Sequence, residues 1–305
     1  MLRFFIRRII YMIAVVVLVT LFVFVLSRAS GDPRTVFMNE YTTQEQWDKW
    51  GEEWGLDKPV IVQYWIWLKE AAQGNLGNSL RENRPVLEVI LERIPATLEL
   101  AAGSFIFAIV VGIPGGVISA VNRGSALDYF GRVFALFGQA LPPFWLGIML
   151  ILIFSVELNL LPTGRRGGID HFILPCITLG WLTASGLLRI VRSSMLEVMD
   201  SEYIKLARAK GVSNSIVVWK HAFRNALIAP LTMAALIFVA FLTGAVVTET
   251  VFAWPGIGRL AVTSVSSLDL AVLSGVVMIL TSLYVIVNFI TDLLYAVIDP
   301  RIRLT

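Results

Sequence analysis

Residues that could do chemistry are scarce in this chain. His171 and His221 are its only histidines, too few and too far apart in sequence to form a metal-ligand cluster. Cys176 is the only cysteine, so an intrachain disulfide is impossible, and its apolar neighbours favour a buried small residue over a reactive thiol. The chain also lacks the Gly-x-x-x-x-Gly-Lys-Ser/Thr loop that binds nucleotide phosphates. We therefore expect no catalytic residue, metal or cofactor on the chain itself.

One polar segment, Asp200 to Ser213, has a composition suited to binding rather than to catalysis. Its pattern predicts a helix, a stop at Gly211 and a second helix that begins at Ser213. One face of the first helix carries Tyr203, Leu206, Ala207 and Lys210. With basic residues around it, such a face suits a docking element for a soluble partner, and it equally suits a basic amphipathic helix lying on anionic lipid.

The rest of the sequence indicates that a membrane protein positions these residues. Hydrophobic residues make up 57% of the 305 residues, charged residues only 15%, and the mean hydropathy is +0.76, so the bilayer is the expected solvent. A net charge of +3 is too small and too dispersed for a nucleic-acid partner. Six stretches meet or approach the roughly 20 apolar residues that a spanning helix needs. They are Ile9–Leu26, Leu98–Val121, Tyr129–Val156, Phe172–Val191, Ala226–Val247 and Leu270–Val297.

The short loops predict the orientation of these spans. The first stretch follows three arginines, a pattern that is also found in signal peptides. Its apolar run is long, however, and no small-residue cleavage site follows, so we expect a retained span. Lys and Arg mark the cytoplasmic side in short loops. They gather before the first span and in alternate loops, at Arg3, Arg7, Arg8, Arg123, Arg192, Lys205, Arg208, Lys210, Lys220, Arg224, Arg301 and Arg303. Both termini are therefore expected in the cytoplasm.

Residues 30–95 are expected to form a small helical insertion outside the cytoplasm. A first helix should follow a capping box formed by Thr42 and Glu45. It would carry Trp47, Trp50 and Trp54 on one face. These Trp side chains could contact a soluble partner, although a place at the membrane interface or in a core is favoured for them.

Two more helices are expected in the same insertion. One should start near Pro59 and end by Gly74, with an apolar face made of Ile61, Tyr64, Trp65 and Leu68. The other should run from Pro85 to Ile94, with one side made of Leu87, Ile90, Leu91 and Ile94.

Proline and glycine occur inside the spans, where a straight helix would exclude them. The pair Pro142-Pro143, and Pro114 with Gly112, Gly115 and Gly116, should break or kink the third and second spans. Such breaks either line a pathway or shape the packing between helices, and the sequence leaves both open. Four acids, Glu99, Glu157, Glu249 and Asp292, lie near span ends, where an interfacial location is expected.

The polar segment and several other motifs resemble a known family. Ala207 to Gly211 is similar to the cytoplasmic "EAA" loop of ABC importer permeases, although Lys205 and Leu206 replace its first Glu and second residue. Tyr203 to Gly211, followed by His221 to Leu227, resembles the form of this loop in one branch of the family. The closest resemblance is to the branch that serves dipeptide, oligopeptide and nickel importers. Further matching motifs span nearly the whole chain in the family's order: Glu92 to Glu99, Pro142 to Gly147, Glu249 to Arg259 and Asp299 to Arg301.

This resemblance implies an all-α integral membrane protein of six transmembrane helices that forms half of an import pathway. It implies three regions: 1–29 as tail and first span, 30–95 as the extracytoplasmic insertion, and 96–305 as a five-helix core with a coupling loop at 196–225. The implied coupling-loop residues are Glu202, Tyr203, Leu206, Ala207, Arg208, Lys210, Gly211, Ser213, His221, Arg224 and Asn225. Candidates for the pathway or its gate are Pro142, Pro143, Glu249, Trp254, Pro255 and Gly256.

The resemblance also implies partners and a location. A permease of this kind pairs with a homologous second permease, binds two cytoplasmic ATPase subunits that hold ATP and Mg, and receives substrate from an extracytoplasmic binding protein. It lies in the plasma (inner) membrane of a bacterium or archaeon.

Two other classes of protein compete with this interpretation. A secondary carrier or channel would need inverted repeats and mid-membrane ionisable residues, and neither is evident. A membrane-embedded enzyme would need a Ser/His/Asp set, a metal motif or a carboxylate pair inside the spans, and none falls together there. The sequence does not name the cargo: peptide is the first choice, with nickel or an oligosaccharide behind it.

Overall fold

The protein is described here by a computed structural model that covers residues 2–36, 38, 42–53, 55–227, 230, 241 and 245–298. It divides into two compact units, which are described separately: Met1–Pro95 with Pro255–Thr305, and Ala96–Trp254. The described residues are helical and contain no strand beyond an isolated bridge between Asn78 and Pro85, in agreement with the predicted all-α class.

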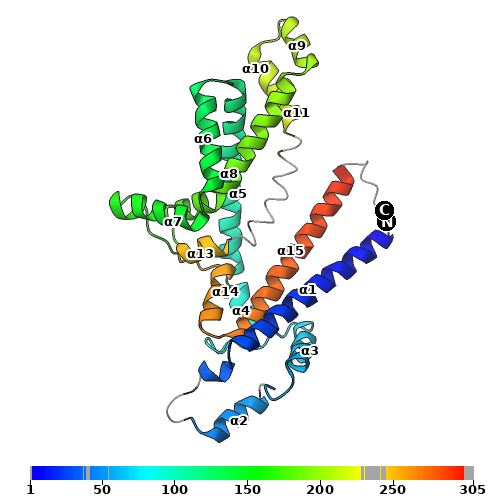
Figure 1. The fold of residues 1–305 in the computed structure, drawn as a ribbon, viewed down its shortest axis with the longest axis vertical. Coiled ribbons are helices and arrows are strands. Elements are labelled where there is room, and N and C mark those ends of the chain that lie inside the picture. The colour runs from blue at the N-terminus through cyan, green and yellow to red at the C-terminus, as the bar shows by residue number, and fades with distance from the viewer. Residues whose placement is uncertain are drawn as a thin grey trace. The chain divides into compact units, whose positions relative to one another are not determined.

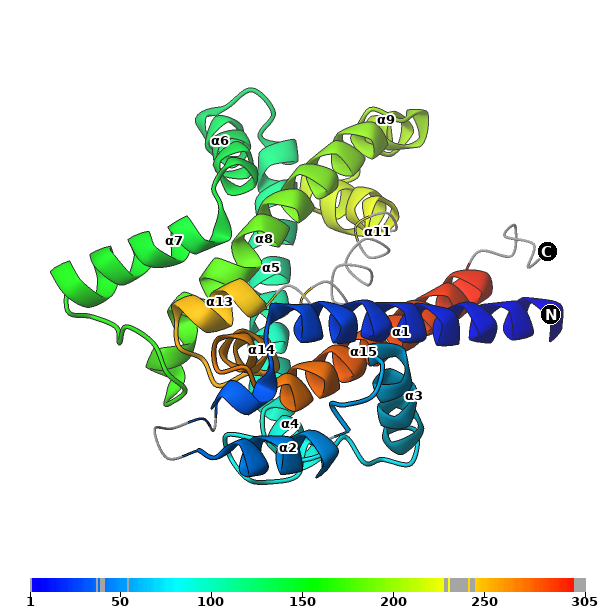
Figure 2. The same ribbon diagram turned by 60° about the horizontal axis from the view of Figure 1, so that its bottom comes forward.

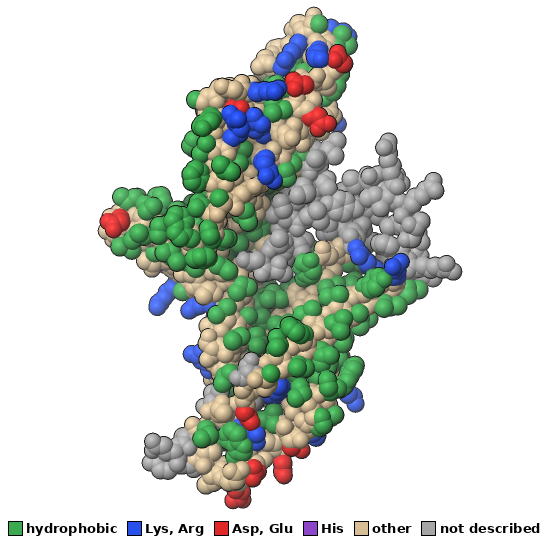
Figure 3. Space-filling view, viewed as in Figure 1, with side chains coloured by type: hydrophobic (Ala, Val, Ile, Leu, Met, Phe, Trp, Pro, Cys, Tyr) green, Lys and Arg blue, Asp and Glu red, His purple; other side chains and the backbone are tan. Residues whose placement is uncertain are grey.

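The first unit brings together the two ends of the chain. Its helices are α1 (Leu2–Ser30), the 3-10 turn η1 (Pro33–Val36), α2 (Gln44–Glu53), α3 (Val60–Ala71), α4 (Val86–Leu91), α14 (Ile257–Ser266) and α15 (Leu270–Ile298). Although α1 and α15 are far apart in sequence, they pack side by side (Figures 1 and 2). The outer surface of α1 is apolar, with Leu18 and Phe22 exposed, as expected of a helix that faces lipid (Figure 3).

The core of the first unit forms where α4, α14 and the start of α15 meet. Val86 and Ile90 of α4 pack there against Ile257 of α14 and against Val272 and Val276 of α15. All five side chains are buried, so this cluster fixes α14 against the α4 segment.

The helices predicted for residues 30–95 form, but some of their details differ from the predictions. The reciprocal capping box joins Thr43 and Gln46, one residue later than expected, because these two side chains reach each other's backbone N–H groups. Trp54, the last member of the expected Trp face, lies outside the described residues.

The buried faces of α3 and α4 also differ from the expected ones. In α3, Tyr64 is buried while Ile61 and Trp65 are exposed, because the Tyr64 hydroxyl donates to the Val17 carbonyl, at 2.9 Å. The predicted third helix from Pro85 to Ile94 is shorter, and its buried side chains are Val86, Val89 and Ile90. Leu91 points away and is exposed, so the expected side of this helix was wrong at that residue.

The second unit contains most of the remaining apolar helices. They are α5 (Ile94–Val121, within this unit from Ala96), α6 (Ala126–Ala140), α7 (Pro143–Leu150), the π-helical η2 (Ile151–Glu157), α8 (Ile169–Met199), α9 (Glu202–Ala209), α10 (Asn214–Ile216), the π-helical η3 (Val217–Phe223), α11 (Arg224–Ala226) and α13 (Val246–Val251).

Five of the six predicted spans can be compared with the described residues. Four helical stretches are long and apolar enough to cross a membrane: Ile6–Ala29, Val86–Val121, Ile169–Met199 and Leu270–Ile290. A bent pair of helices can supply a fifth span. Most of the predicted span Ala226–Val247 lies outside the described residues, so the count of six stays a prediction.

The bent pair agrees with the third predicted span, Tyr129–Val156, which was expected to break or kink at the Pro pair. Helix α6 ends before Pro142, and Pro143–Glu157 continues at an angle of 110° to it. The cause is the Pro pair: Pro143 has no N–H to donate, and a residue that precedes proline is driven into extended backbone. Leu141 is indeed extended, with φ of −81° and ψ of 126°.

The second span, expected to break or kink at Pro114, is not broken there. Helix α5 continues through this residue, and the neighbouring glycines serve packing instead. A Cβ atom on Gly112 would lie 2.7 Å from the Ala184 carbonyl oxygen, and one on Gly116 would lie 2.7 Å from that of Leu188. These glycines therefore let the backbones of α5 and α8 approach closely, as small residues do in membrane helix pairs.

Candidate functional site

The predicted helix, glycine stop and second helix are all present after α8. Helix α9 follows Ser201, and α10 begins at Asn214, directly after Ser213. The Gly211 N–H donates to the Arg208 carbonyl at 3.0 Å, and the Val212 N–H donates to the Ala207 carbonyl at 3.2 Å. This pair of bonds is a Schellman motif, which requires the residue after the helix to be left-handed. Gly211 has φ of +78°, so its predicted conformation is confirmed.

Helix α9 is anchored by a single buried side chain. Ile204 is fully buried in a cluster built from α5, α8, η3 and α11, whose members are Val117, Ala120, Val191, Met195, Val217, Val218, Ala222 and Ala226. Val212 packs against the same cluster from the far side of the glycine turn. Burial of one Ile side chain stabilises such an arrangement by about 1.5–3 kcal/mol, which is enough to hold a short helix in one position.

The side of α9 opposite Ile204 is presented to solvent. Tyr203 is 44% exposed and Leu206 57% exposed, and Arg208 and Lys210 are exposed beside them. The structure differs from the expected face at Ala207, which is half-buried and packs against the Ile204 cluster. The reason is helical spacing, because Ala207 lies three residues after Ile204 and shares its side of the helix.

Hydrogen bonds connect the Tyr203 hydroxyl to η3 and α11. The Asn225 side-chain amide donates to the Tyr203 hydroxyl at 3.0 Å and to the His221 carbonyl at 2.9 Å. The Tyr203 hydroxyl also lies 3.4 Å from that carbonyl oxygen. Three residues from the two segments of the loop motif are thus brought together, and His221 takes part through its backbone carbonyl.

Basic side chains surround this exposed surface. Figure 3 shows Lys and Arg gathered at the end of the second unit that carries α9, and Arg208, Lys210, Lys220 and Arg224 are among the exposed residues of the loop. Lys205 pairs with Glu202 at 2.7 Å, one turn away on the same helix. The surface therefore presents an aromatic ring and an aliphatic side chain within a positive rim, an arrangement that suits binding to an acidic or polar partner surface.

Two gate candidates pack α13 and the turn after it against the start of α5. Glu249 is fully buried inside the protein and accepts a hydrogen bond from the Thr97 hydroxyl at 2.7 Å, and its interfacial depth stays a prediction. Trp254 is also fully buried, and its indole N–H donates to the Ala96 carbonyl at 2.8 Å. Its ring lies 5.8 Å from the ring of Phe172.

The six gate candidates are divided between the two units, with Glu249 and Trp254 in the second. Pro142 and Pro143 lie at the bend between α6 and α7, within the second unit. Pro255 and Gly256 belong to the first unit, where Gly256 precedes α14.

Comparison with known proteins identifies the family of the chain. Residues 112–304 match the family model for the inner membrane component of binding-protein-dependent transport systems, and residues 1–101 match the model for the N-terminal part of such components. The chain belongs to this family. It is therefore an integral membrane transport component.

Relatives of this transport component align over its full length. The oligopeptide transport system permease protein AppB of Bacillus subtilis is 39% identical over 99% of this chain and 100% of its own. The dipeptide transport system permease protein DppB of Alkalihalophilus pseudofirmus is 36% identical over 99% and 100%. The glutathione transport system permease protein GsiC of Escherichia coli K12 is 37% identical over 99% of both chains.

Solved structures show the same fold for the transport component. An inward-facing structure of the methionine ABC transporter MetNI superposes with a TM-score of 0.57 and 19% identity, over 70% of this chain and 97% of that one. An amino acid ABC transporter superposes with a TM-score of 0.51 and 14% identity, over 68% and 92%.

Sequence reasoning missed Ile204, although a signal for it was present. Ile204, Ala207 and Val212 form an apolar stripe interrupted by the glycine turn, and that stripe is the buried side of α9 in this transport component. The predicted face of Tyr203, Leu206, Ala207 and Lys210 took in Ala207 from this buried side but left out Ile204.

Proposed function

We propose that this chain is the permease subunit of an ATP-driven peptide importer and that α9 couples it to ATPase subunits. The observation that carries the proposal is the construction of α9. A short helix is held rigidly by Ile204 on one side and presents Tyr203 and Leu206 on the other. A helix that transmits motion between subunits must be fixed to its own chain and exposed to its partner, and α9 meets both requirements.

The proposed complex contains five protein components. This chain pairs with a homologous second permease to form the pathway, and two ATPase subunits bind at α9 and its neighbour on the second permease. An extracytoplasmic binding protein delivers the substrate. ATP and Mg are held by the ATPase subunits, in keeping with the missing phosphate-binding loop in this sequence.

The proposed topology has six spans with both termini inside. The α6–α7 pair is one span bent at Pro142, and residues 226–247 form the span between α11 and α13. Residues 30–95 and the segment around α14 then lie outside, whereas α9 lies in the cytoplasm, consistent with the cations near it. The plasma membrane of a bacterium is the proposed location.

Peptide is the proposed cargo because the full-length relatives named above are permeases for oligopeptides, dipeptides and glutathione. The experiment is to purify the complex with its binding protein and to identify bound solute by mass spectrometry. Import of that solute is then followed in vesicles that contain ATP inside. Recovery and ATP-dependent uptake of a short peptide would support the proposal, whereas uptake of nickel or an oligosaccharide alone would refute the cargo assignment.

A further inference from the structure

Helix α3 (Val60–Ala71) turns apolar side chains outward and polar ones inward. Its exposed stripe recurs at the spacing of one helix face and consists of Ile61, Val62, Trp65 and Ile66. The side that faces the protein holds Gln63 and the hydroxyl of Tyr64, and both residues are buried. A surface helix in water shows the opposite pattern, with its apolar face toward the core. The exposed stripe therefore indicates a surface that something apolar covers.

The Tyr64 hydroxyl sets the position of α3 along α1. It donates to the Val17 carbonyl and also lies 2.9 Å from the Thr20 hydroxyl. The ring of Tyr64 lies 5.6 Å from that of Phe24 and 6.0 Å from that of Trp67. The contact between the two helices is thus buried and made by hydrogen bonds as well as by packing.

This contact falls well inside the apolar stretch of α1. No charged residue occurs between Arg8 and Arg28, and the candidate span is Ile6–Ala29. A charged side chain near the end of a span reaches toward the headgroups, so Arg28 marks one boundary of the hydrocarbon layer. At about 1.5 Å per residue, Thr20 lies roughly 12 Å and Val17 roughly 16 Å along the helix from Arg28.

The distance along α1 converts into a depth below the membrane surface. A tilt of about 40°, the upper end of the usual range, still leaves the Thr20 contact roughly 9 Å deep. Half of the hydrocarbon layer is only about 15 Å thick. Because α1 spans the membrane, the part of α3 that carries Tyr64 lies within the hydrocarbon layer. Amphipathic helices at a membrane surface bury their apolar faces to a similar depth, about 5–10 Å.

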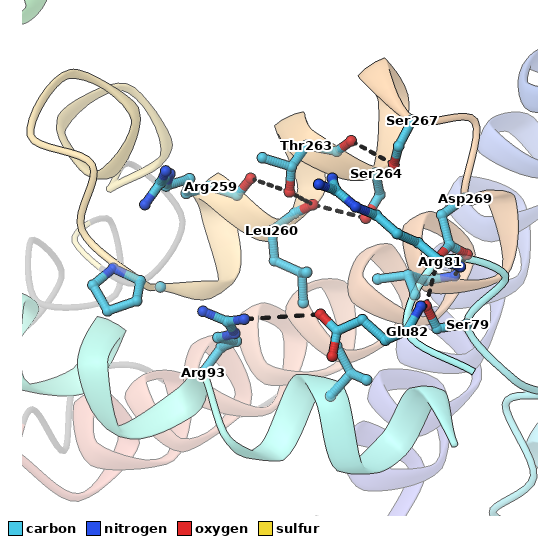
Figure 4. A pocket seen from close by; sticks show the side chains of 14 residues that line it. Ser79, Arg81, Glu82, Arg93, Arg259, Leu260, Thr263, Ser264, Ser267 and Asp269 are labelled. Atoms are coloured by element: carbon cyan, nitrogen blue, oxygen red, sulfur yellow. Dashed lines mark hydrogen bonds and ion pairs between the residues drawn. The ribbon is translucent and has the colours of Figure 1, made fainter. Parts of the chain in front are cut away.

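Both ends of α3 are fastened within the first unit. Before the helix, the Gln63 side-chain amide donates to the Lys58 carbonyl at 2.8 Å. After it, Ala71 packs in the cluster formed by α4, α14 and α15. The Ser79 hydroxyl in the following turn donates to Asp269, which precedes α15, at 2.6 Å (Figure 4). The depth of α3 therefore follows from that of α1 and α15.

Lipid acyl chains are the occupant that suits an apolar stripe at this depth. The outer surface of α1 is apolar, and in Figure 3 hydrophobic side chains cover α1 and continue onto the neighbouring α3. The stripe thus extends a surface that already faces lipid. Its aromatic member, Trp65, is of a residue type enriched where the hydrocarbon layer meets the headgroups. A soluble partner would have to enter the membrane to cover the same side chains.

We infer that α3 lies in the outer leaflet of the membrane, with the stripe of Ile61, Val62, Trp65 and Ile66 against phospholipid acyl chains. The inference rests on the proposed topology, which places residues 30–95 on the outer side. It divides this insertion into a membrane-embedded α3 and a water-exposed α2, whose exposed residues include Glu45 and Asp48.

The test measures the depth of a nitrobenzoxadiazole label at Trp65→Cys in the whole complex in nanodiscs. Phe22→Cys, on the lipid-facing side of α1, and Asp48→Cys, on α2, are the matched controls. Background labelling is small because Cys176 is buried. Phosphatidylcholine with a nitroxide near the top of its acyl chain should quench the labels at positions 65 and 22 about 2-fold or more, because both lie in the leaflet. Aqueous iodide should quench only the label at position 48.

Three results would overturn the inference. The label at position 65 could respond like that at position 48, with quenching by iodide and none by the lipid. Loss of lipid quenching on addition of the binding protein would show that a protein covers the stripe. Reaction of Asp48→Cys with an impermeant reagent only from inside would contradict the outer leaflet. If Trp65→Cys does not insert, Ile61→Cys on the same stripe decides the question.

Failure of the inference can be separated from failure of the proposed function. A label in lipid at position 22 and in water at position 65 would remove α3 from the membrane and leave the first span in place. Both labels in water would refute the position of that span as well. ATP hydrolysis stimulated by the peptide-loaded binding protein, measured on the same nanodiscs, tests the importer assignment independently of either label.

Discussion

Substitution of Gly211 by Val tests whether the geometry of α9 sets its function. Gly211 has φ of +78°, and an added Cβ would meet no other atom within 4 Å, so the effect of a side chain is backbone strain without a steric clash. A left-handed conformation costs a residue with a Cβ about 1–2 kcal/mol. The alternative is to rotate Gly211 out of that region, which breaks the two Schellman hydrogen bonds, each contributing about 0.5–1.5 kcal/mol.

The strain energy and the energy of the two hydrogen bonds are of similar size, so the variant should populate conformations of the loop in which the end of α9 is displaced. A difference of 1–2 kcal/mol lowers the fraction of correctly placed α9 about 5- to 30-fold. We therefore expect Gly211→Val to weaken retention of the ATPase subunits by about that factor, while the chain still inserts. Gly211→Asn should retain more binding, because Asn tolerates the left-handed region better than a β-branched residue does.

The assay is a titration of ATPase subunits onto the permease pair in nanodiscs. Gly124→Val is the matched control, because Gly124 has φ of +81° and open space around it, in the turn between α5 and α6. It introduces the same strain away from α9. Unchanged affinity in Gly211→Val, or equal loss in both variants, would refute the reasoning.

Three further predictions address topology and the buried anchors. Asp48→Cys should react with an impermeant thiol reagent from outside, with little background because Cys176 is buried, and reaction only from inside would overturn the topology. Ile204→Ala should destabilise the anchored loop by about 2–5 kcal/mol, seen as faster proteolysis after α8, and unchanged cleavage would contradict the anchor. Trp254→Phe should remove the indole hydrogen bond to the Ala96 carbonyl, which keeps its partner within α5, and lower the free energy of unfolding by about 0.5–1.5 kcal/mol in thermal melts; an unchanged melt would contradict that hydrogen bond.

Much of the fold was predictable because membrane helices follow from local composition. Apolar runs located α1, α5, α8 and α15, and a Pro pair located the break near residue 142, since both depend on neighbouring residues only. Pro114 shows the limit of this reasoning. Whether a proline breaks a helix depends on what packs around it, and the contact between α5 and α8 is not visible in either segment alone.

In the candidate site, the turn at Gly211 was predictable from the sequence, whereas the exposed and buried faces of α9 were less so. The glycine at position 211 predicted a left-handed turn, because few other residues suit that backbone. Ala207 was assigned to the docking side, yet it packs inward with Ile204, because the cluster that receives both comes from α5, α8, η3 and α11. The contact of Tyr64 with the middle of α1 was not predictable at all, since Tyr64 and Thr20 are 44 positions apart in sequence.

The half-buried position of Ala207 changes how the coupling role is best tested. A substitution there, such as Ala207→Asp, would disturb the Ile204 cluster as well as any partner contact. Leu206 is the better position, because it is 57% exposed on α9. Ile216, 47% exposed on α10 of the same loop, offers the matched control.

The central measurement is ATP hydrolysis stimulated by the loaded binding protein in reconstituted vesicles, compared between Leu206→Glu and Ile216→Glu. A charge buried without a partner in a subunit interface disfavours binding by several kcal/mol, whereas on a lipid-facing helix it would only weaken adsorption. The coupling account predicts that Leu206→Glu abolishes stimulation and uptake while Ile216→Glu keeps both, and that both variants still pair with the second permease. Normal stimulation and normal uptake in Leu206→Glu would contradict the account.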